Sequence, residues 1–160
     1  MAGPAIRQER PDHPQVIALL DGLDRYLDSL YPPEANHILD VRALLAPEVH
    51  FLVAEVDGAV VGCGAFRRMP GEPDTGGRPY GEIKRMVTAP AARGQGVGGA
   101  LMRALEARLR AEGLPLALLE TGEAQVEAVR LYERCGYRRR GPFGGYPDNG
   151  LSLFYEKSLA

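Results

Sequence analysis

A glycine-rich stretch near the middle of the chain has the spacing of a phosphate-binding loop. Residues 93–105 read RGQGVGGALMRAL, and the first part satisfies G-x-G-x-x-G, the pattern of a dinucleotide-binding turn. Glycines let backbone N–H groups approach an anion, and the N-terminus of a following helix adds partial positive charge. We expect a pyrophosphate to bind at seven consecutive residues: Arg93, Gly94, Gln95, Gly96, Val97, Gly98 and Gly99. A loop that only caps a helix would not need four glycines in six residues beside an arginine.

The segment before this loop argues against a dinucleotide site. A dinucleotide fingerprint ends an apolar, doubly buried strand and turns directly into its helix. Here the preceding strand, GEIKRMV, is charged, and the six residues TAPAAR separate Val87 from Gly94. A Walker loop is excluded because no Lys-Ser/Thr pair follows the glycines. The loop therefore keeps its predicted affinity for phosphate, whereas a nicotinamide or flavin ligand is disfavoured.

The elements that must position this loop are predicted in the order β-α-α-β-β-β-α-β-α-β-β. Two β-rich runs that flank Asp57-Gly58 form the clearest local signal, a hairpin with a tight turn. Later strands alternate with helices, which favours an α/β fold with a mixed sheet and helices on both faces. The expected strands are residues 5–10, 49–56, 59–66, 80–89, 114–120, 136–140 and 151–159. The expected helices are residues 12–30, 38–45, 97–113 and 123–135.

The first helix has a predicted N-terminal cap and a predicted buried stripe. Asp12 is in position to cap the helix, Gln15 occupies the capping-box position, and Pro14 suits the first turn. The apolar residues at helical spacing, which we expect to be buried, are Ile17, Leu20, Leu23, Leu27 and Leu30.

Length, charge and cysteine usage exclude several classes of protein. One domain spanning residues 1–160 is expected, and a net charge of -2 offers no basic footprint for nucleic acid. No apolar run approaches membrane-spanning length, so a soluble, cytoplasmic protein with reduced thiols is expected. The three histidines form no cluster with either cysteine. We therefore expect surface histidines, no metal, and a buried Cys135 thiol rather than a nucleophile.

Two segments of the sequence together resemble the GNAT superfamily of N-acetyltransferases. EIKRMVTAPAARGQGVGGALM matches its pattern Arg/Gln-x-x-Gly-x-Gly/Ala through Arg93, Gly96 and Gly98. AVRLYERCGY is similar to its A-x-x-L-Y-x-x-x-G-F/Y element, and the resemblance covers roughly residues 49–158 and, weakly, the N-terminal helices. It implies a mixed, mostly antiparallel sheet of about seven strands. It also implies coenzyme A, not a dinucleotide, as the ligand whose pyrophosphate the glycine loop binds.

The resemblance further implies residues that contact the coenzyme and the departing thiolate. The backbone at Met86 and Val87 is expected to pair with the pantetheine arm, and an N–H there is the expected oxyanion donor. Tyr132 is the expected acid for the thiolate, although a helical tyrosine on an apolar stripe is ordinarily a core residue. Gln125 stands seven residues earlier, where the family often has asparagine, and is expected to contact the coenzyme.

Acetyl transfer to an amine also requires a base, because the amine must lose a proton. Glu82 is the expected base, acting directly or through a water, since many family members have a glutamate on this strand. The alternative is a solvated strand carboxylate paired with Lys84 or Arg103. Glu120, at the end of the next strand, is the second candidate, with a capping or substrate-orienting role as its alternative.

These assignments predict an acetyl-CoA-dependent N-acetyltransferase that transfers acetyl directly to a primary amine in a ternary complex. The alternatives are a coenzyme-A-binding sensor or interaction domain without turnover, and an acyltransferase with another acyl group or a hydroxyl acceptor. The segments YPPEANH and GPFGGYPDNG are expected to border the acceptor pocket, with Glu34, Asp148 and Tyr146 near a cationic amine. Acetyl-CoA is the expected cosubstrate, with no metal, nucleic acid or membrane partner. The acceptor's identity and the formation of a homodimer are left open.

Overall fold

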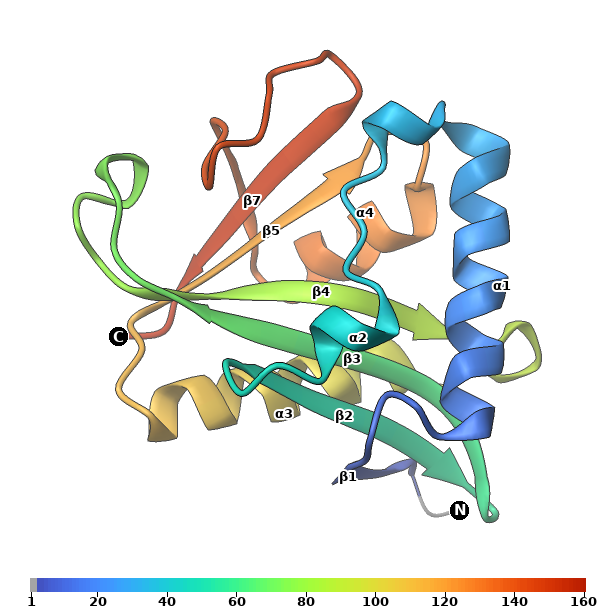
Figure 1. Cartoon of the computed structure of the whole chain (residues 1–160). Coiled ribbons are helices and arrows are strands. Elements are labelled where there is room, and N and C mark those ends of the chain that lie inside the picture. Colours follow the sequence, from blue (N-terminus) through green and yellow to red (C-terminus); the bar gives the residue numbers. More distant parts are fainter. Residues whose placement is uncertain (1–2) are drawn as a thin grey trace. The chain divides into compact units, whose positions relative to one another are not determined.

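The computed structural model describes residues 3–160, and in that range the elements follow the predicted order (Figure 1). The strands are β1 Ala5–Gln8, β2 Val49–Val56, β3 Ala59–Met69, β4 Tyr80–Thr88, β5 Leu116–Gly122, β6 Arg138–Arg140 and β7 Ser152–Ser158. The helices are α1 Pro14–Leu30, α2 Val41–Leu44, α3 Val97–Ala111 and α4 Val126–Arg134. Short 3-10 turns lie at Pro33–Ala35, Pro73–Thr75 and Pro90–Ala92.

The strands form one seven-stranded sheet in the order β1-β2-β3-β4-β5-β7-β6. β1 pairs with β2, β5 with β7 and β6 with β7 in antiparallel fashion, whereas β4 pairs with β5 in parallel. Parallel neighbours need a crossover connection, and the chain between β4 and β5 contains α3. The predicted mixed, mostly antiparallel sheet of seven strands is therefore confirmed.

The fold divides into two compact units. The first unit comprises the chain up to Phe66 together with Lys84–Leu105, and the second comprises Arg67–Ile83 together with Glu106–Ala160. The glycine loop belongs to the first unit. The predicted acid and both predicted bases belong to the second.

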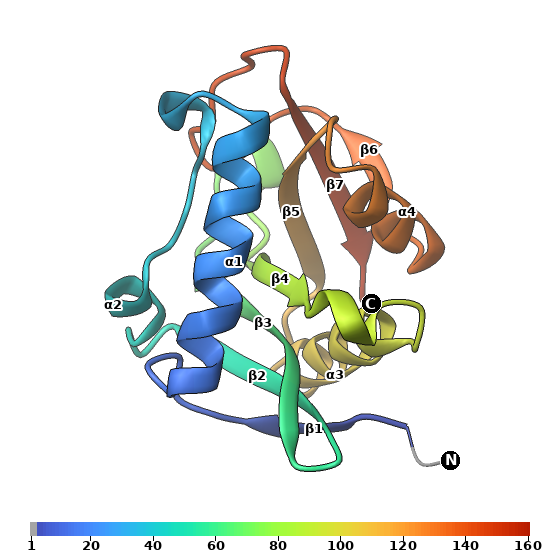
Figure 2. The same ribbon diagram turned by 90° about the vertical axis from the view of Figure 1, so that its right-hand side faces the viewer.

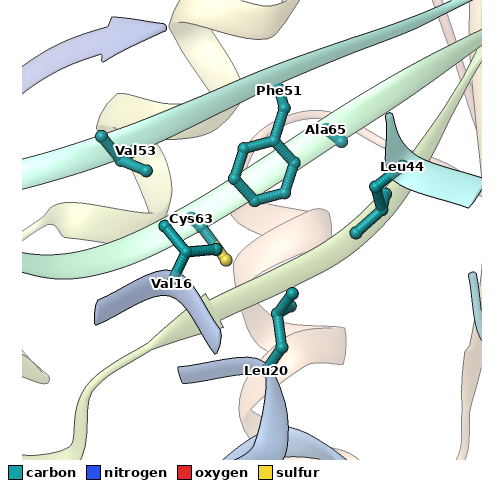
Figure 3. Packing of buried hydrophobic residues seen from close by; sticks show 7 residues of the cluster. All are labelled: Val16, Leu20, Leu44, Phe51, Val53, Cys63 and Ala65. Carbon is teal, nitrogen blue, oxygen red and sulfur yellow. The ribbon is translucent and has the colours of Figure 1, made fainter. Parts of the chain in front are cut away.

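The core of the first unit lies between α1, α2, β2 and β3 (Figure 3). Phe51 and Val53 alternate along β2 and Cys63 and Ala65 alternate along β3, so that each pair points to one face of its strand. The buried residues that meet there are Val16, Leu20, Leu44, Phe51, Val53, Cys63 and Ala65.

The predicted stripe of α1 is only partly correct. Leu20 is buried as expected, but Val16 is the other buried residue of the helix. Ile17 is 37% exposed, because the buried face runs through the i, i+4 pair Val16 and Leu20 rather than through position 17. Leu23, Leu27 and Leu30 are half-buried.

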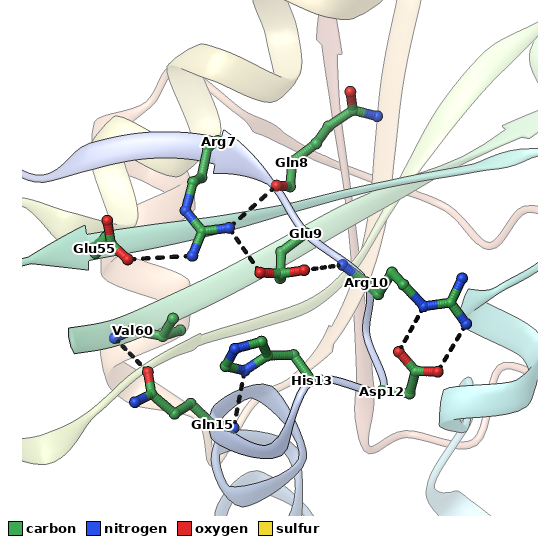
Figure 4. Close-up of polar contacts among 9 residues, drawn as sticks. All are labelled: Arg7, Gln8, Glu9, Arg10, Asp12, His13, Gln15, Glu55 and Val60. Carbon is green, nitrogen blue, oxygen red and sulfur yellow. Dashed lines mark hydrogen bonds and ion pairs between the residues drawn. The ribbon is translucent and has the colours of Figure 1, made fainter. Parts of the chain in front are cut away.

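The start of α1 also differs from the sequence prediction (Figure 4). His13, not Asp12, is the N-cap, and its Nδ1 accepts a hydrogen bond from the Gln15 backbone N–H at 3.1 Å. The Asp12 carboxylate is bound instead by the Arg10 guanidinium, at 2.8 and 3.0 Å. The Gln15 side chain accepts from the Val60 N–H at 2.9 Å and so does not complete a capping box. His13 therefore caps the helix in place of aspartate, which is the more common N-cap residue.

The core of the second unit is an aromatic and aliphatic cluster against β4, β5 and β7. Its buried members are Tyr80, Leu116, Leu118, Phe143 and Phe154. Figure 2 shows β5, β7 and β6 side by side, with β7 between the other two. Glu82 pairs in register with Leu118, and Glu120 lies two residues further along β5. Because alternate residues share one face of a strand, Glu82 and Glu120 point to the face that carries this cluster.

Candidate active site

The glycine loop presents its backbone without obstruction. Gly94 and Gly96 have φ values of 80° and 79°, in the left-handed region that side chains rarely adopt. Both residues are exposed, and a Cβ built on either would meet no described atom within 4 Å. The loop therefore leaves open space directly over its own backbone, which is where a bound phosphate would have to approach.

Helix α3 begins directly after these glycines. The Ala100 N–H donates to the Gly96 carbonyl at 3.1 Å, so Val97, Gly98 and Gly99 already form the first turn. Backbone N–H groups in a first turn have no acceptor within their own helix, and they carry the positive end of its dipole. Val97 is buried, which anchors the turn in the first unit. Arg93, just before the loop, is exposed and supplies a full positive charge.

Strand β4 changes direction at Arg85. Its φ of 58° is unusual for a residue other than glycine, and inside a strand it redirects the backbone that follows. The buried Arg85 guanidinium donates to Asp24 of α1 at 2.6 Å and to the Leu20 carbonyl at 3.5 Å. Met86 and Val87, the predicted pantetheine contacts, are the next two residues and are half-buried.

Glu82 is a buried carboxylate with two donors from its own unit. It is 1% exposed, so the alternative of a solvated strand carboxylate is wrong. Arg67 Nη2 donates to its Oε1 at 2.9 Å, and the Tyr146 hydroxyl donates to its Oε2 at 2.5 Å. A buried carboxyl group needs such partners, and the fold supplies them from β3 and from the loop before β7.

Tyr132 lies near the end of α4 and is 7% exposed. Its ring makes an edge contact with Tyr137, with centroids 6.2 Å apart. Burial raises the pKa of its hydroxyl well above the usual value, and electrostatic interactions with Cys135 and Glu120 raise it further. The phenol is therefore protonated at neutral pH, which a general acid must be. The burial is equally that of a core aromatic, so both interpretations of Tyr132 fit its position.

Gln125 precedes α4 instead of lying inside it. The helix was expected from residue 123 but begins at Val126, and Gln125 is its N-cap residue. The Gln125 side-chain amide donates to the Thr121 hydroxyl at 3.1 Å, which joins it to the end of β5. The predicted coenzyme contact of Gln125 remains a prediction.

The histidines and cysteines differ in part from expectation. His50 is buried, not on the surface, with its ring 5.2 Å from that of Phe66 and its Nδ1 3.3 Å from Gln8 Nε2. Cys63 is the fully buried thiol, and burial raises its pKa to about 12. Cys135, predicted to be buried, is only half-buried because it caps the C-terminal end of α4.

Within residues 3–160 the structure offers neither a metal-binding cluster nor a membrane-spanning helix. Groups of three or more His, Cys, Asp or Glu side chains that could hold a metal ion do not occur there. Among the helices of the same range, none combines the length and apolar character needed to cross a membrane.

Two contributors to the site, Arg67 and Glu72, were not foreseen from the sequence, and a third, Tyr146, was predicted in another role. Arg67 is separated from Glu82 by 15 positions and Tyr146 by 64, so no local spacing links them. Tyr146 was expected near the acceptor amine, not at Glu82. Glu72 joins two loops, since its carboxylate accepts from the Gly144 N–H at 2.7 Å and from the Tyr80 hydroxyl at 3.1 Å. For Arg67 and Glu72, polar character was the only signal that the sequence offered.

Comparisons with known sequences agree on one family. Residues 16–137 match the model of the Acetyltransferase (GNAT) family. The IAA acetyltransferase of Azospirillum brasilense is 46% identical over 159 residues, covering 99% of this chain and 100% of the relative. The uncharacterised N-acetyltransferase YsnE of Bacillus subtilis is 31% identical over 147 residues, covering 91% of this chain and 93% of the relative.

Solved structures share the fold. A crystal structure from Klebsiella pneumoniae, assigned to the acyl-CoA N-acyltransferases, aligns with a TM-score of 0.80 at 34% identity and covers 98% of both chains. The PaiA N-acetyltransferase of Thermoplasma acidophilum, solved with coenzyme A, aligns with a TM-score of 0.75 at 15% identity. It covers 98% of this chain and 99% of its own, and at that identity the likeness concerns the fold alone.

Proposed function

Because the chain belongs to the GNAT family of acetyltransferases, we propose that it transfers acetyl from acetyl-CoA directly to a primary amine in a ternary complex. The observation that carries the proposal is the glycine loop. Gly94 and Gly96 hold left-handed backbone conformations with open space above them, and α3 begins at the next residue. This combination suits the pyrophosphate of coenzyme A.

The loop and the redirected strand are proposed to hold the coenzyme. Arg93 and the backbone of residues 94–99 bind the pyrophosphate, and Gln125 adds a side-chain contact. Met86 and Val87 follow the left-handed Arg85, which supports a role for their backbone in pairing with the pantetheine arm. An N–H of the same pair donates to the oxyanion as the thioester carbonyl is attacked.

The proton transfers are assigned to two residues of the second unit. The amine nitrogen attacks the thioester carbon and the C–S bond breaks. Glu82 takes the proton that the amine loses, directly or through a water, and Tyr132 gives a proton to the departing thiolate. Support comes from the burial of Glu82 among hydrogen-bond donors and from the raised pKa of Tyr132, which keeps the phenol protonated. Glu120 remains the second candidate base.

The proposed ligand is tested most simply by competition between two coenzymes. We expect coenzyme A to bind the full chain and NAD not to bind, because the charged β4 and the spacer before Gly94 do not suit a dinucleotide turn. Equilibrium dialysis with each ligand measures both affinities. Tighter binding of NAD than of coenzyme A would overturn the proposal.

The acceptor is proposed only as a class, a primary amine. The relative from Azospirillum brasilense carries the name IAA acetyltransferase, so IAA belongs in any acceptor panel beside primary amines. A coenzyme-A sensor would bind the coenzyme and release no thiol with any acceptor. An acyltransferase of different specificity would release thiol from another acyl-CoA or with a hydroxyl acceptor. Thiol release therefore separates the three functions.

A further inference from the structure

We propose that Tyr146 is a positioning residue for Glu82, which it holds by donating its hydroxyl hydrogen to Oε2. The inference rests on the proposed function, in which Glu82 takes a proton from the acceptor amine. A carboxylate that serves this purpose must be held at a fixed orientation, because small displacements of a reacting group cost rate.

The two donors of Glu82 bind its two oxygens separately. Arg67 binds Oε1 and Tyr146 binds Oε2, so rotation of the carboxylate about its last torsion breaks both hydrogen bonds. Arg67 reaches Glu82 Oε1 with Nη2 at the end of a long, flexible side chain. Tyr146 is the more rigid donor of the two, since its half-buried ring has only two χ angles and packs against Phe143 and Phe154.

The surroundings of the Tyr146 ring fix the position of its hydroxyl. The ring makes an edge contact with Phe143, with centroids 5.5 Å apart, and a tilted contact with Phe154 at 6.0 Å. Both partners are buried in the core of the second unit. Two χ angles of a packed aromatic ring leave little freedom, so the hydroxyl is presented to Glu82 at low entropic cost.

Hydrogen bonds also fix the backbone of the turn that carries Tyr146. The Tyr146 N–H donates to the Phe143 carbonyl at 3.1 Å across Gly144 and Gly145, whose φ values of 62° and 77° form a tight turn. Glu72 accepts from the Gly144 N–H at 2.7 Å, which ties this turn to the loop before β4. The glycines of this loop thus serve to aim Tyr146, in addition to any contact with an acceptor.

The protonation of Tyr146 agrees with a donor role. Burial raises the pKa of its hydroxyl, the Glu82 carboxylate raises it further, and Glu120 adds a smaller effect of the same sign, while Arg67 opposes them. The phenol therefore keeps its hydrogen throughout the neutral range and can donate it to Glu82 without interruption.

The test is a double-mutant cycle on turnover, using the full chain, acetyl-CoA and the best acceptor of the panel. Tyr146→Phe removes one hydroxyl and keeps the ring, so we expect kcat to fall about 10- to 100-fold with the KM for acetyl-CoA unchanged. In a Glu82→Gln background, the same change should cause no further loss, because Tyr146 acts through Glu82. Tyr155→Phe is the matched control, since it also removes a tyrosine-to-carboxylate hydrogen bond of the second unit, 3.1 Å to Glu133.

The possible outcomes distinguish the role of Tyr146 from the proposed acetyl transfer. Equal thermal unfolding midpoints for Tyr146→Phe and Tyr155→Phe, with loss of kcat only in the former, would support the proposal. Additive losses in the double variant, or full activity of Tyr146→Phe, would overturn it while leaving the proposed acetyl transfer intact. A wild-type protein that releases no thiol with any acceptor would overturn the proposed function, and the role of Tyr146 with it.

Discussion

At the scale of single residues, Tyr132 and Tyr146 are two phenols of one unit for which we propose different roles. Burial is the main reason that the pKa of each hydroxyl lies above its usual value. The charge of Glu120 contributes to both shifts, so this carboxylate lies within electrostatic reach of both rings. The Tyr146 hydroxyl donates a hydrogen bond to Glu82. Tyr132 is instead the phenol that we propose gives its proton to the thiolate.

The proposed acid can be removed with little change in packing. Tyr132→Phe deletes one hydroxyl and keeps the edge contact with Tyr137. We expect kcat to fall on the order of 10²–10⁴-fold, the usual effect of losing a general acid, with coenzyme affinity nearly unchanged. Steady-state kinetics together with calorimetry of coenzyme A binding measure the two effects. Turnover equal to wild type would return Tyr132 to the role of a core aromatic.

The proposed base predicts a dependence on pH. Glu82→Gln keeps the size and polarity of the side chain but cannot take a proton, so kcat/KM should fall most at neutral pH. A lysine-like acceptor has a pKa of about 10.4, and as pH rises toward it more of the amine arrives already neutral. The difference in kcat/KM between the variant and wild type should therefore shrink as the pH rises.

Profiles of kcat/KM against pH for both proteins test this expectation, with Glu120→Gln as the comparison. If the ratio of wild-type kcat/KM to Glu82→Gln kcat/KM stayed constant across the pH range, Glu82 would be removed as the base. If this ratio fell toward one with rising pH only for Glu120→Gln, the role would pass to Glu120.

The sequence predicted some of these residues and not their partners. Tyr132 and Glu82 could be singled out because each lies within a short motif whose spacing is local. The donors to Glu82 come from β3 and from the loop before β7, and only the folded chain brings them together. Burial of Glu82 was likewise missed, because EIKR within a strand has the charge pattern of an exposed face.

At the scale of elements, the β-α turn of residues 93–99 combines left-handed glycines with a helix N-terminus. Gly94 and Gly96 free the backbone for an anion, and the first turn of α3 supplies N–H donors. Gly98 and Gly99 differ from them, since they lie within α3. The requirement for a left-handed conformation therefore explains the first two glycines of this motif and does not explain the last two.

Two glycines of the chain provide a matched test of this turn. Gly96 and Gly58 have nearly the same φ, 79° and 80°, and an added Cβ would meet no described atom within 4 Å at either site. Alanine should therefore cost about 1 kcal/mol of stability at each position, from the left-handed conformation alone. Only Gly96→Ala should weaken coenzyme A binding, on the order of 10-fold, because its Cβ occupies the space required by the phosphate.

Calorimetry of coenzyme A binding and chemical unfolding of both variants make the comparison. If Gly58→Ala and Gly96→Ala bound the coenzyme as tightly as wild type while losing equal stability, the loop would be only a helix cap.

The order of the elements was predictable, but several of their ends were not. β2 has the predicted bounds because its β-rich run ends at the Asp57-Gly58 turn. β3 continues past its predicted end at Phe66 to Met69, since strand pairing extends through residues whose own pattern is polar. The N-cap of α1 is His13 and that of α4 is Gln125, and neither residue is singled out by the N-cap preference for Ser, Thr, Asp and Asn.

At the scale of the whole molecule, identity to the Azospirillum brasilense relative runs along almost the entire chain and is not confined to the motifs proposed to bind the coenzyme. The Azospirillum brasilense relative aligns over 99% of this chain at 46% identity, so the segments proposed to border the acceptor are included in the match. The net charge of -2 gives no general attraction for polyanions. The class of the acceptor is open to direct measurement.

Release of free thiol from acetyl-CoA, measured with a panel of primary amines and IAA, tests the central claim most directly. We predict that thiol release requires an acceptor, that at least one primary amine supports it, and that mass spectrometry finds that amine acetylated. Binding of coenzyme A without thiol release for any acceptor would contradict acetyl transfer and identify a sensor.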